Sequence, residues 1–379
     1  MAVVQKLILG LGTCLLVFLL LNLDGYNFSF HETSFGFIDE IKPIFTSESN
    51  KIARPLPVDL TSIPNELHTS VVFTGDVLLA RNIESLMKNK DLDYPFSGLS
   101  FKDFSQKPYV FGNFEASVPE VHIPTKPLAM NFSVDKSMLT PAVRAGFTHF
   151  SLANNHSFDN KKEGFENTRI ALNTNGILTL GHPRKISSES ISYISLQESK
   201  VAIIAVSALN SEPTVSEIKS VLKSASRQSD FQIVYIHWGD EYASVSNNSQ
   251  KELARLFIDA GADMIIGHHP HVVQEVGYYK NTLIFYSLGN YIFDQYFSEE
   301  VQTGLLLNLD FLDQAVISLV PVTSLDNLSQ PTYMKEKKHS EFLSALALKS
   351  DPKLQDYIKA GVIPLNILVA TSSKIAMMD

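Results

Sequence analysis

Short apolar runs recur along the middle of the chain, and segments with a helical pattern separate several of them. The apolar runs, rich in β-branched residues, occupy residues 71–74, 149–153, 201–206, 233–236, 264–266 and 283–286. Short runs of this kind are typical of strands that are buried on both faces. The intervening patterns predict helices at residues 141–145, 161–175, 215–226 and 250–260. Gly176 and Gly261 mark two helix ends, and the alternation of strands with helices predicts an α/β fold.

The segments on either side of this alternation have different patterns. Residues 305–311 and 315–322 predict a β-hairpin, and the residues after it predict mostly helical structure at the periphery. Residues 26–64 mix aromatic, charged and proline residues without periodicity, which is typical of a linker. We therefore expect an N-terminal segment at residues 1–25, the linker at 26–64, a main domain at 65–325 and a helical extension at 326–379.

The N-terminal segment has the pattern of a membrane anchor. Residues 7–23 are almost entirely apolar and, with residues 2–4, approach the ~20 residues of a membrane helix. Lys6 precedes this run, and positive charge on that side predicts a cytoplasmic N-terminus. A cleavable signal peptide has a similar pattern, but no small residues of the A-x-A kind follow the run. We favour an uncleaved single-pass anchor that leaves the bulk of the chain outside the cytoplasm.

The composition of the chain argues against some classes of function. The chain has 379 residues, of which 45% are hydrophobic, so it can bury a large core. Its formal charge of −9 argues against a nucleic-acid partner, because phosphate binding requires a basic surface. Cys14 is the single cysteine of the chain, which excludes an intrachain disulfide and a cysteine-based zinc site.

Polar clusters follow the predicted strands. They lie at residues 75–76, 112–115, 153–159, 237–242, 267–271 and 287–295, and they supply aspartate, glutamate, asparagine and histidine. In open α/β sheets, ligands bind beyond the carboxyl ends of the strands. Six clusters in that position therefore predict one converging site, and the three histidines within residues 268–271 are its densest part.

Each cluster taken alone also has a structural explanation. Asp76 is equally consistent with a helix cap, and Asn155 and Asp159 are consistent with turns. His237 alone is consistent with a hydrogen-bonded core histidine, whereas the His-Pro-His sequence at residues 269–271 is more specific. Together, carboxylate, amide and imidazole donors indicate a divalent metal such as Mn, Fe or Zn. Because such ligands must be deprotonated, metal binding is expected to depend on pH near the free histidine pKa of ~6.5.

The order of these motifs resembles that of the CapA-type capsule-synthesis proteins. The motifs are Gly-Asp, Gly-Asn-x-Glu, Asn-Asn-His-x-x-Asp, His-Trp-Gly-x-Glu-Tyr, Gly-x-His-Pro-His-Val-x-Gln and Ser-Leu-Gly-Asn-x-x-x-Asp-Gln, all between residues 71 and 295. This family is associated with poly-γ-glutamate capsule production and belongs to the calcineurin-like metallophosphoesterases. The resemblance implies an α/β fold of the four-layer αββα sandwich type. It also implies an anionic polymer such as poly-γ-glutamate, and capsule synthetase subunits, as partners.

The resemblance implies roles for individual residues as well. The expected metal ligands, for one or two ions, are Asp76, Glu115, Asn155, His237, His269 and His271. The expected catalytic residues are His156, which assists the leaving group, and Asp159. The residues expected around the substrate are Asn113, Glu241, Tyr242, Gln274, Asn290, Asp294 and Gln295. His268 is expected to support the site without binding the metal.

One position departs from the phosphoesterase pattern. Leu78 stands where these enzymes usually carry the histidine of an Asp-x-His motif, and a leucine side chain offers no donor atom. The ion of Asp76 and His271 therefore lacks a ligand, so a weaker second site or a single ion is expected. His269, which the family pattern places on the fuller ion, is expected to matter more for metal binding than His271.

Three functions are consistent with these features. The first is a membrane-anchored component of capsule or poly-γ-glutamate synthesis or export, with a metal-dependent hydrolase-like site. The second is a periplasmic metallophosphoesterase, in which His156 protonates the leaving oxygen. The third is a non-catalytic polymer-binding module whose site has decayed at Leu78. The sequence alone leaves all three open.

The charge bias at Lys6 leads to a testable prediction about topology. Residues from about 65 onward are expected to lie outside the cytoplasm and to remain tethered by residues 7–23. N-terminal sequencing should find the apolar segment intact, and protease added to spheroplasts should digest the domain. A mature N-terminus downstream of Asp24, or a domain protected from the protease, would contradict this topology.

Overall fold

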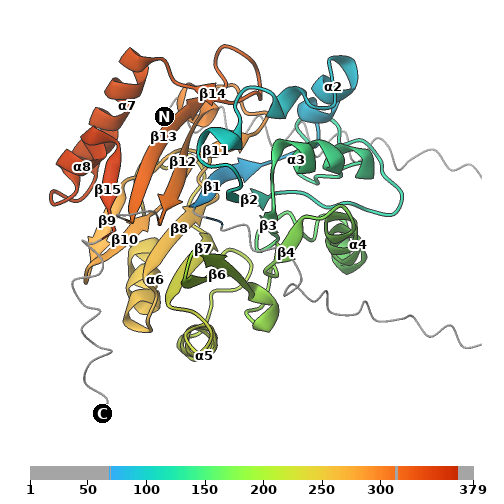
Figure 1. Ribbon diagram of the computed structural model, residues 1–379. Helices are drawn as coiled ribbons and strands as arrows, with labels where there is room; N and C mark the ends of the chain where they lie inside the picture. The colour runs from blue at the N-terminus through green and yellow to red at the C-terminus, as the bar shows by residue number, and fades with distance from the viewer. Residues whose placement is uncertain (1–67, 69, 312–314, 366–379) are drawn as a thin grey trace, which may run out of the picture. The chain divides into compact units, whose positions relative to one another are not determined.

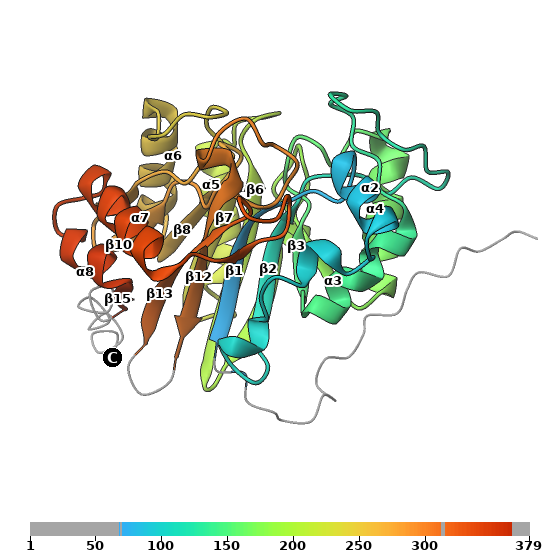
Figure 2. The same cartoon turned by 90° about the horizontal axis from the view of Figure 1, so that it is seen from above.

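The computed structural model describes residue 68, residues 70–311 and residues 315–365. Within them, two β-sheets pack against each other and helices lie around them (Figure 1, Figure 2). The predicted α/β fold is thus confirmed as a sandwich of two mixed sheets. The predicted membrane segment at residues 7–23 and the linker at 26–64 lie outside the described residues. None of the helices in the described part is long and apolar enough to span a bilayer.

The first sheet combines strands from the beginning and the end of the described chain. Its order is β14-β13-β12-β1-β2-β3-β4, with β11 beside β1 and β15 beside β13. Strands β1 to β4 run parallel to one another, and β12 joins β1 in the antiparallel sense. The predicted hairpin is β12 and β13, which pair over their full lengths. The strands are β1 (Ser70–Val77), β2 (Tyr109–Phe114), β3 (His149–Ser151), β4 (Leu178–Leu180), β11 (Asn290–Ile292), β12 (Thr303–Asp310), β13 (Val316–Thr323), β14 (Thr332–Tyr333) and β15 (Val362–Pro364).

The second sheet is formed by the middle of the chain. Its order is β5-β6-β7-β8-β10-β9, in which β6, β7, β8 and β10 run parallel. The two edge strands, β5 and β9, are antiparallel to their neighbours. The strands are β5 (Ile191–Leu196), β6 (Ser199–Ser207), β7 (Phe231–His237), β8 (Met264–His268), β9 (Val276–Tyr279) and β10 (Thr282–Phe285).

The four helices predicted from the sequence lie within two residues of the expected bounds. Two of them begin at capping boxes, in which Thr214 pairs with Glu217 and Asn247 pairs with Gln250. Each box satisfies main-chain N–H groups that the first helical turn leaves without a partner. The helices are α2 (Asn82–Asn89), α3 (Leu139–Ala145), α4 (Lys161–Thr174), α5 (Val215–Ala225), α6 (Asn248–Asp259), α7 (Glu336–Lys349) and α8 (Gln355–Ala360).

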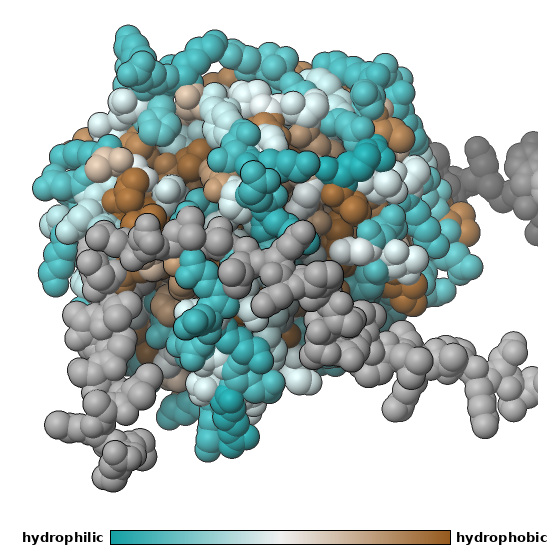
Figure 3. Space-filling model, in the orientation of Figure 1, coloured by the Kyte–Doolittle hydropathy of each residue, from teal (hydrophilic) through white to brown (hydrophobic). Residues whose placement is uncertain are grey.

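Three apolar clusters define the layers. One lies between the sheets and joins Phe73 of β1 to Tyr235 of β7. A second packs helices such as α4, through Leu172, against the other face of the first sheet. The third packs α5 and α6, through Leu222 and Phe257, against the second sheet. The order is therefore helices, sheet, sheet, helices, and the face of the molecule in Figure 3 is mostly hydrophilic with scattered apolar patches.

The C-terminal part contains strands that the sequence pattern did not predict. Helices α7 and α8 agree with the helical pattern, but β14 and β15 both pair with β13. Leu343 of α7 and Ile358 of α8 contribute to the cluster between the sheets. The end of the described chain is thus an integral part of the sandwich and not a peripheral addition, because its apolar side chains are buried in the common core.

Two glycines allow the loops at one rim to approach closely. A Cβ atom on Gly75 would lie 2.0 Å from the carbonyl oxygen of Gly289, and one on Gly267 would lie 2.0 Å from that of Tyr286. The N–H of Asp76 donates to Gly289 O at 3.0 Å across the first of these contacts. A side chain at either glycine would therefore push apart the segments that carry the polar clusters.

Asp263, between α6 and β8, should make stability depend on pH. Its carboxylate accepts a hydrogen bond from Gln232 N at 2.8 Å. Burial raises the pKa of Asp263 to about 6, although that hydrogen bond opposes the rise. The unfolded pKa is about 3.9, so the folded state holds the proton to higher pH and the free energy of unfolding falls as pH rises from about 4 to 6.

Asp263→Asn cannot titrate and should lose that part of the pH dependence. Urea unfolding at pH 4 and pH 7 should show the variant gaining roughly 1–3 kcal/mol relative to wild type over this interval. Asp230→Asn is the matched control, because exposed Asp230 also accepts a main-chain N–H, that of Lys200, at 2.8 Å. An unchanged pH dependence in Asp263→Asn would show that this carboxyl does not hold its proton.

Candidate metal centre

Strand ends from both sheets meet at one rim of the sandwich. In the first sheet, Asp76 of β1 pairs in register with Asn113 of β2. In the second sheet, His237 ends β7 and pairs with His268, which ends β8. The ring centroids of His237 and His269 are 4.8 Å apart. The structure therefore brings the polar clusters that follow these strands to one place.

Asn113 lies at the centre of the buried part of the site. Its amino group donates to Asp76 Oδ1 at 2.8 Å, to Glu115 Oε1 at 3.0 Å and to His237 Nδ1 at 3.0 Å. Asn154 fixes this orientation, since its Nδ2 donates to Asn113 Oδ1 at 3.1 Å. An amide has two such hydrogens, so three acceptors share them. The motif had placed Asn113 near the substrate and had given Asn154 no role, whereas both are buried among the candidate ligands.

The pKa values of the two buried carboxylates, Asp76 and Glu115, are shifted in opposite directions. Nδ1 of His268 and Nδ1 of His271 each lie 3.3 Å from the Asp76 carboxylate. Burial alone would raise the pKa of Asp76, but the hydrogen bonds and charges of His268 and His271 hold it well below its usual range. Burial and then the charge of Asp76 raise the pKa of Glu115 well above its usual range. Asp76 is therefore charged, and Glu115 keeps its proton to higher pH.

Two of the site histidines, His237 and His269, favour the neutral form. Burial, followed by the neighbouring His269, lowers the pKa of His237 well below its usual value. Burial, followed by His271, lowers the pKa of His269 to about 4. Both rings are neutral near pH 7, which is the form that binds metal. The pH dependence expected near 6.5 from free histidine is thus wrong for His269, because burial moves its titration lower.

Two groups of donors are compact enough to hold an ion. The donor atoms within each group lie within 4.8 Å of one another. We call them the buried group, which is Asp76, Glu115 and His237, and the mouth group, which is Glu241, His269 and His271. Asn155, the remaining expected ligand, has its Oδ1 2.8 Å from Nε2 of His237.

The residues of both groups fit a divalent metal. Among the described residues, Glu115 Oε2 and His269 Nδ1 are buried and have no hydrogen-bond partner. Buried polar atoms are nearly always paired, so such exceptions are consistent with a ligand that binds there. Carboxylate and imidazole donors together suit Mn, Fe or Zn.

His156 and Asp159 form a pair beside the buried group. His156 Nδ1 lies 2.9 Å from Asp159 Oδ2, and the same oxygen accepts the N–H of Phe132 at 2.6 Å. The Phe132 ring stacks on His156 with centroids 4.0 Å apart. These contacts fix the imidazole ring with Nδ1 toward the carboxylate, and His156 lines a cavity of about 410 Å³.

Three of the residues expected around the substrate line this cavity. They are Tyr242, Asp294 and Gln295. Arg81, which belongs to none of the six motifs, lines it too and donates from Nε to Asp294 at 3.1 Å, with a second bond from Nη2. Its guanidinium carbon lies 4.5 Å from the ring centroid of Phe132. Arg81 follows Asp76 by five positions, but only the fold places it beside the site.

Two other residues expected around the substrate, Asn290 and Gln274, are buried and form hydrogen bonds with the loops of the site. Asn290 Oδ1 lies 2.9 Å from His271 Nδ1, which holds that ring. Gln274 is 1% exposed, and its Nε2 donates to Ala243 O at 2.9 Å. Their side chains are therefore used within the protein and do not line the cavity beside His156.

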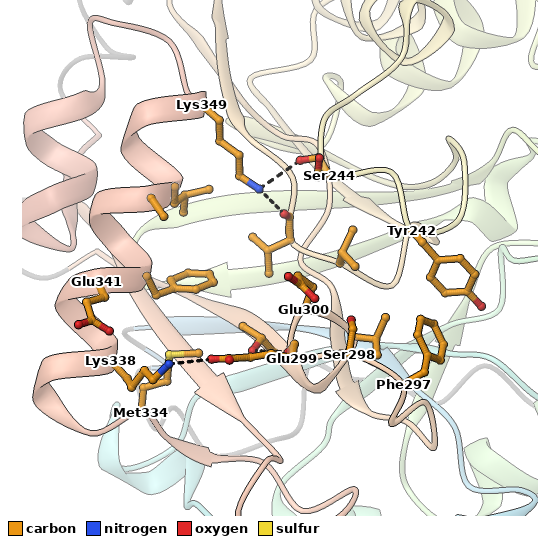
Figure 4. Close-up of a pocket in the computed structure, with 17 residues that line it drawn as sticks. Tyr242, Ser244, Phe297, Ser298, Glu299, Glu300, Met334, Lys338, Glu341 and Lys349 are labelled. Carbon is orange, nitrogen blue, oxygen red and sulfur yellow. Dashed lines mark hydrogen bonds and ion pairs between the residues drawn. The ribbon is translucent and has the colours of Figure 1, made fainter.

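A second cavity, of about 590 Å³, adjoins the first. Tyr242 and Phe297 line both cavities. Figure 4 shows these two rings at one end and the α7 side chains Lys338 and Lys349 at the other. Lys338 pairs with Glu299 at 3.1 Å, and Lys349 Nζ donates to main-chain carbonyls at 3.1 and 2.6 Å. The two cavities therefore lie side by side, and His156 and His271 line the smaller one.

The fold and the site define a class of protein, a two-sheet α/β sandwich with a cluster of candidate metal ligands at one rim. The chain belongs to the family of the bacterial capsule synthesis protein PGA_cap, whose model matches residues 70–295. It is 31% identical over 251 residues to the PGA biosynthesis protein CapA of Bacillus subtilis (strain 168), which covers 60% of this chain and 63% of that protein. It is 26% identical over 316 residues to the capsule biosynthesis protein CapA of Bacillus anthracis, covering 76% and 77%. The family resemblance is thus confirmed.

The solved structures that match this chain are less similar to it in sequence than these relatives. A phosphatase from Mycoplasma pneumoniae is 12% identical with a TM-score of 0.44, and the match covers 67% of this chain and 93% of that one. The sulfate thiohydrolase SoxB of Thermus thermophilus is 10% identical with a TM-score of 0.40, covering 76% and 61%.

The three neighbouring histidines should differ in their effect on metal content. His269→Ala is expected to cause the largest loss, because its ring lies 4.8 Å from that of His237 and 5.9 Å from that of His271 and so reaches both groups. His271→Ala should lose less metal, and His268→Ala least, since the His268 ring packs on Tyr235 at 4.2 Å. Elemental analysis of the purified variants measures this, with thermal unfolding with and without chelator as a check on folding.

If His269→Ala and His271→Ala both kept the metal content of the wild-type protein, the histidine cluster would have a structural role and would not bind the metal. A loss in His268→Ala as large as that in His269→Ala would reject the ranking of the three residues.

Proposed function

We propose that this protein is a membrane-anchored, extracytoplasmic component of poly-γ-glutamate or related capsule synthesis or export, with a metal-dependent hydrolase-like site. The observation that carries the proposal is the cluster of imidazoles and buried carboxylates beside a cavity, in a chain of the capsule-synthesis family. The polymer, and capsule synthetase subunits as partners, are part of the proposal.

The expected ligands of the metal are the six residues named from the motifs, Asp76, Glu115, Asn155, His237, His269 and His271. A bound divalent ion would supply positive charge and Lewis acidity at the rim. The neutral state of His237 and His269 and the unpartnered oxygen of Glu115 support binding there. Mn, Fe and Zn suit this mixture of donors.

His156 is the proposed proton donor to the leaving group. It lines the cavity, and its Nδ1 is held by the Asp159 carboxylate at 2.9 Å. A carboxylate that holds one ring nitrogen fixes the tautomer and stabilises the protonated ring, which suits general acid–base catalysis. Phe132 fixes the position of both partners, by stacking on His156 and by donating its N–H to Asp159. This arrangement favours a hydrolytic site over a purely binding one.

The two adjoining cavities support a chain-like ligand. Tyr242 and Phe297 lie where the cavities meet, so a polymer can pass the donors and continue towards α7. Arg81 is already paired with Asp294, and Lys338 with Glu299, so these cations are largely neutralised. A polyanion therefore requires further positive charge at the site, which a divalent ion would provide.

Substitution of the catalytic pair tests the proposal. His156→Ala and Asp159→Asn are expected to lower metal-dependent cleavage of poly-γ-glutamate by roughly 10²–10⁴-fold while metal content is unchanged. Gel analysis of polymer length and elemental analysis measure the two quantities. His182→Ala is the control, because His182 packs on Phe158 and Phe165 away from the cavity.

Other outcomes distinguish the competing functions. Turnover of a simple phosphodiester but not of the polymer would favour a metallophosphoesterase. Metal-dependent binding of polymer without cleavage, equal in wild type and in both variants, would favour a non-catalytic polymer-binding module.

A further inference from the structure

Glu241 lies on the loop after β7, at the mouth of the site. Its carboxylate and one nitrogen each of His269 and His271 lie within 4.8 Å of one another. Donors around a tetrahedral ion with bonds of about 2.1 Å lie about 3.4 Å apart, so small side-chain movements bring all three to one ion. The motif pattern predicts Glu241 near the substrate, and the geometry places its carboxylate within reach of the candidate ligands His269 and His271.

The backbone that carries the mouth group is held in an uncommon conformation. The φ angle is 63° at Tyr242, 97° at His269 and 59° at His271. Non-glycine residues keep such left-handed angles only where the surroundings hold them, and these positions concentrate at functional sites. Tyr242 N donates to Pro270 O at 2.8 Å, which ties the Glu241 loop to the histidine loop. The two loops are therefore fixed relative to each other.

A hydrogen bond orients one donor of the mouth group, His271. His271 Nδ1 donates to Asn290 Oδ1 at 2.9 Å, which leaves Nε2 of His271 with the lone pair. Gln295 Nε2 donates to the Tyr242 hydroxyl at 2.9 Å, which holds the side chain next to Glu241. Partners of this kind orient metal ligands and fix their tautomers.

The buried group already has a common hydrogen-bond donor, Asn113. The amino group of Asn113 lies 2.8–3.0 Å from one atom of each member of the buried group. Among the described residues, the buried atoms without a hydrogen-bond partner include Glu115 Oε2, His269 Nδ1 and both ring nitrogens of His268, and Glu115 Oε2 lies 4.0 Å from His271 Nε2. An ion at the mouth can take up the atoms of Glu115 and His269 without displacing Asn113.

We propose that Glu241 is a metal ligand and that the mouth group, Glu241, His269 and His271, holds a divalent ion. The proposal rests on the metal site of the proposed function and adds a ligand to it. Leu78, in the first motif, is fully buried in an apolar cluster and contributes no donor to this rim. Glu241 is exposed, so an ion bound there faces solvent and the cavity that His271 and Tyr242 line.

The test is a titration of the full-length protein in detergent with Mn²⁺, followed by electron paramagnetic resonance of the free ion. Glu241→Gln removes the charge and keeps the size of the side chain. It is expected to lose one binding site, or to bind that ion at least about tenfold more weakly. Asp240→Asn, the matched control, removes the same charge one residue away, where Asp240 accepts from Asn247 at 2.7 Å. It is expected to keep the wild-type titration.

A double variant and a replacement ligand sharpen the result. Glu241→Gln combined with His271→Ala is expected to bind as many ions as His271→Ala alone, because both residues hold the same ion. Glu241→His supplies another donor and is expected to recover part of the affinity. A wild-type titration in Glu241→Gln, or an equal loss in Asp240→Asn, overturns the proposal and leaves the other ligands standing. No Mn²⁺ binding by the wild-type protein contradicts the metal site of the proposed function as well.

Discussion

Two neighbouring carboxylates, Asp76 and Glu115, are fully buried. The other residues of the site compensate for the free energy that it costs to remove these carboxylates from water. That cost is several kcal/mol for an uncompensated ion, so each charge needs partners of fixed geometry. Asn113 donates to both carboxylates, and His268 and His271 lie against Asp76. The compensation is incomplete at Glu115, whose pKa is raised and whose Oε2 has no hydrogen-bond partner. A divalent cation at this rim would compensate for the buried negative charge.

The two-sheet architecture makes such a cluster possible. The carboxylates come from the first sheet and most of the imidazoles from the second, so neither sheet contains the site alone. Gly75 and Gly267 permit backbone contacts that any side chain would prevent. Core packing between the sheets then holds the opposing loops at one distance, because an interior at crystal-like density does not deform continuously. The site therefore depends on residues, such as Phe73 and Tyr235, that never contact a ligand.

Two cavities at the surface give access to this site. The cavity beside His156 and the larger one beside α7 meet at Tyr242 and Phe297, two rings that lie 5.1 Å apart. Lys349 of α7 donates to the carbonyls of Ser244 and Val273, so the last long helix is fastened to the loops of the site. The shape of the larger cavity thus depends on the C-terminal segment as much as on the motifs.

The sequence by itself determined the alternation of strands and helices, the position of polar clusters at strand ends, and the family. Those features are local, since periodicity, caps and motif spacing are properties of short segments. Only the tertiary structure decided that β14 and β15 join the first sheet, that Arg81 enters the cavity, and that Asn113 lies among the ligands. It also decided that Glu241 lies with His269 and His271. Strand pairing, left-handed backbone angles and the meeting of two loops depend on contacts between residues far apart in the chain, which no local pattern records.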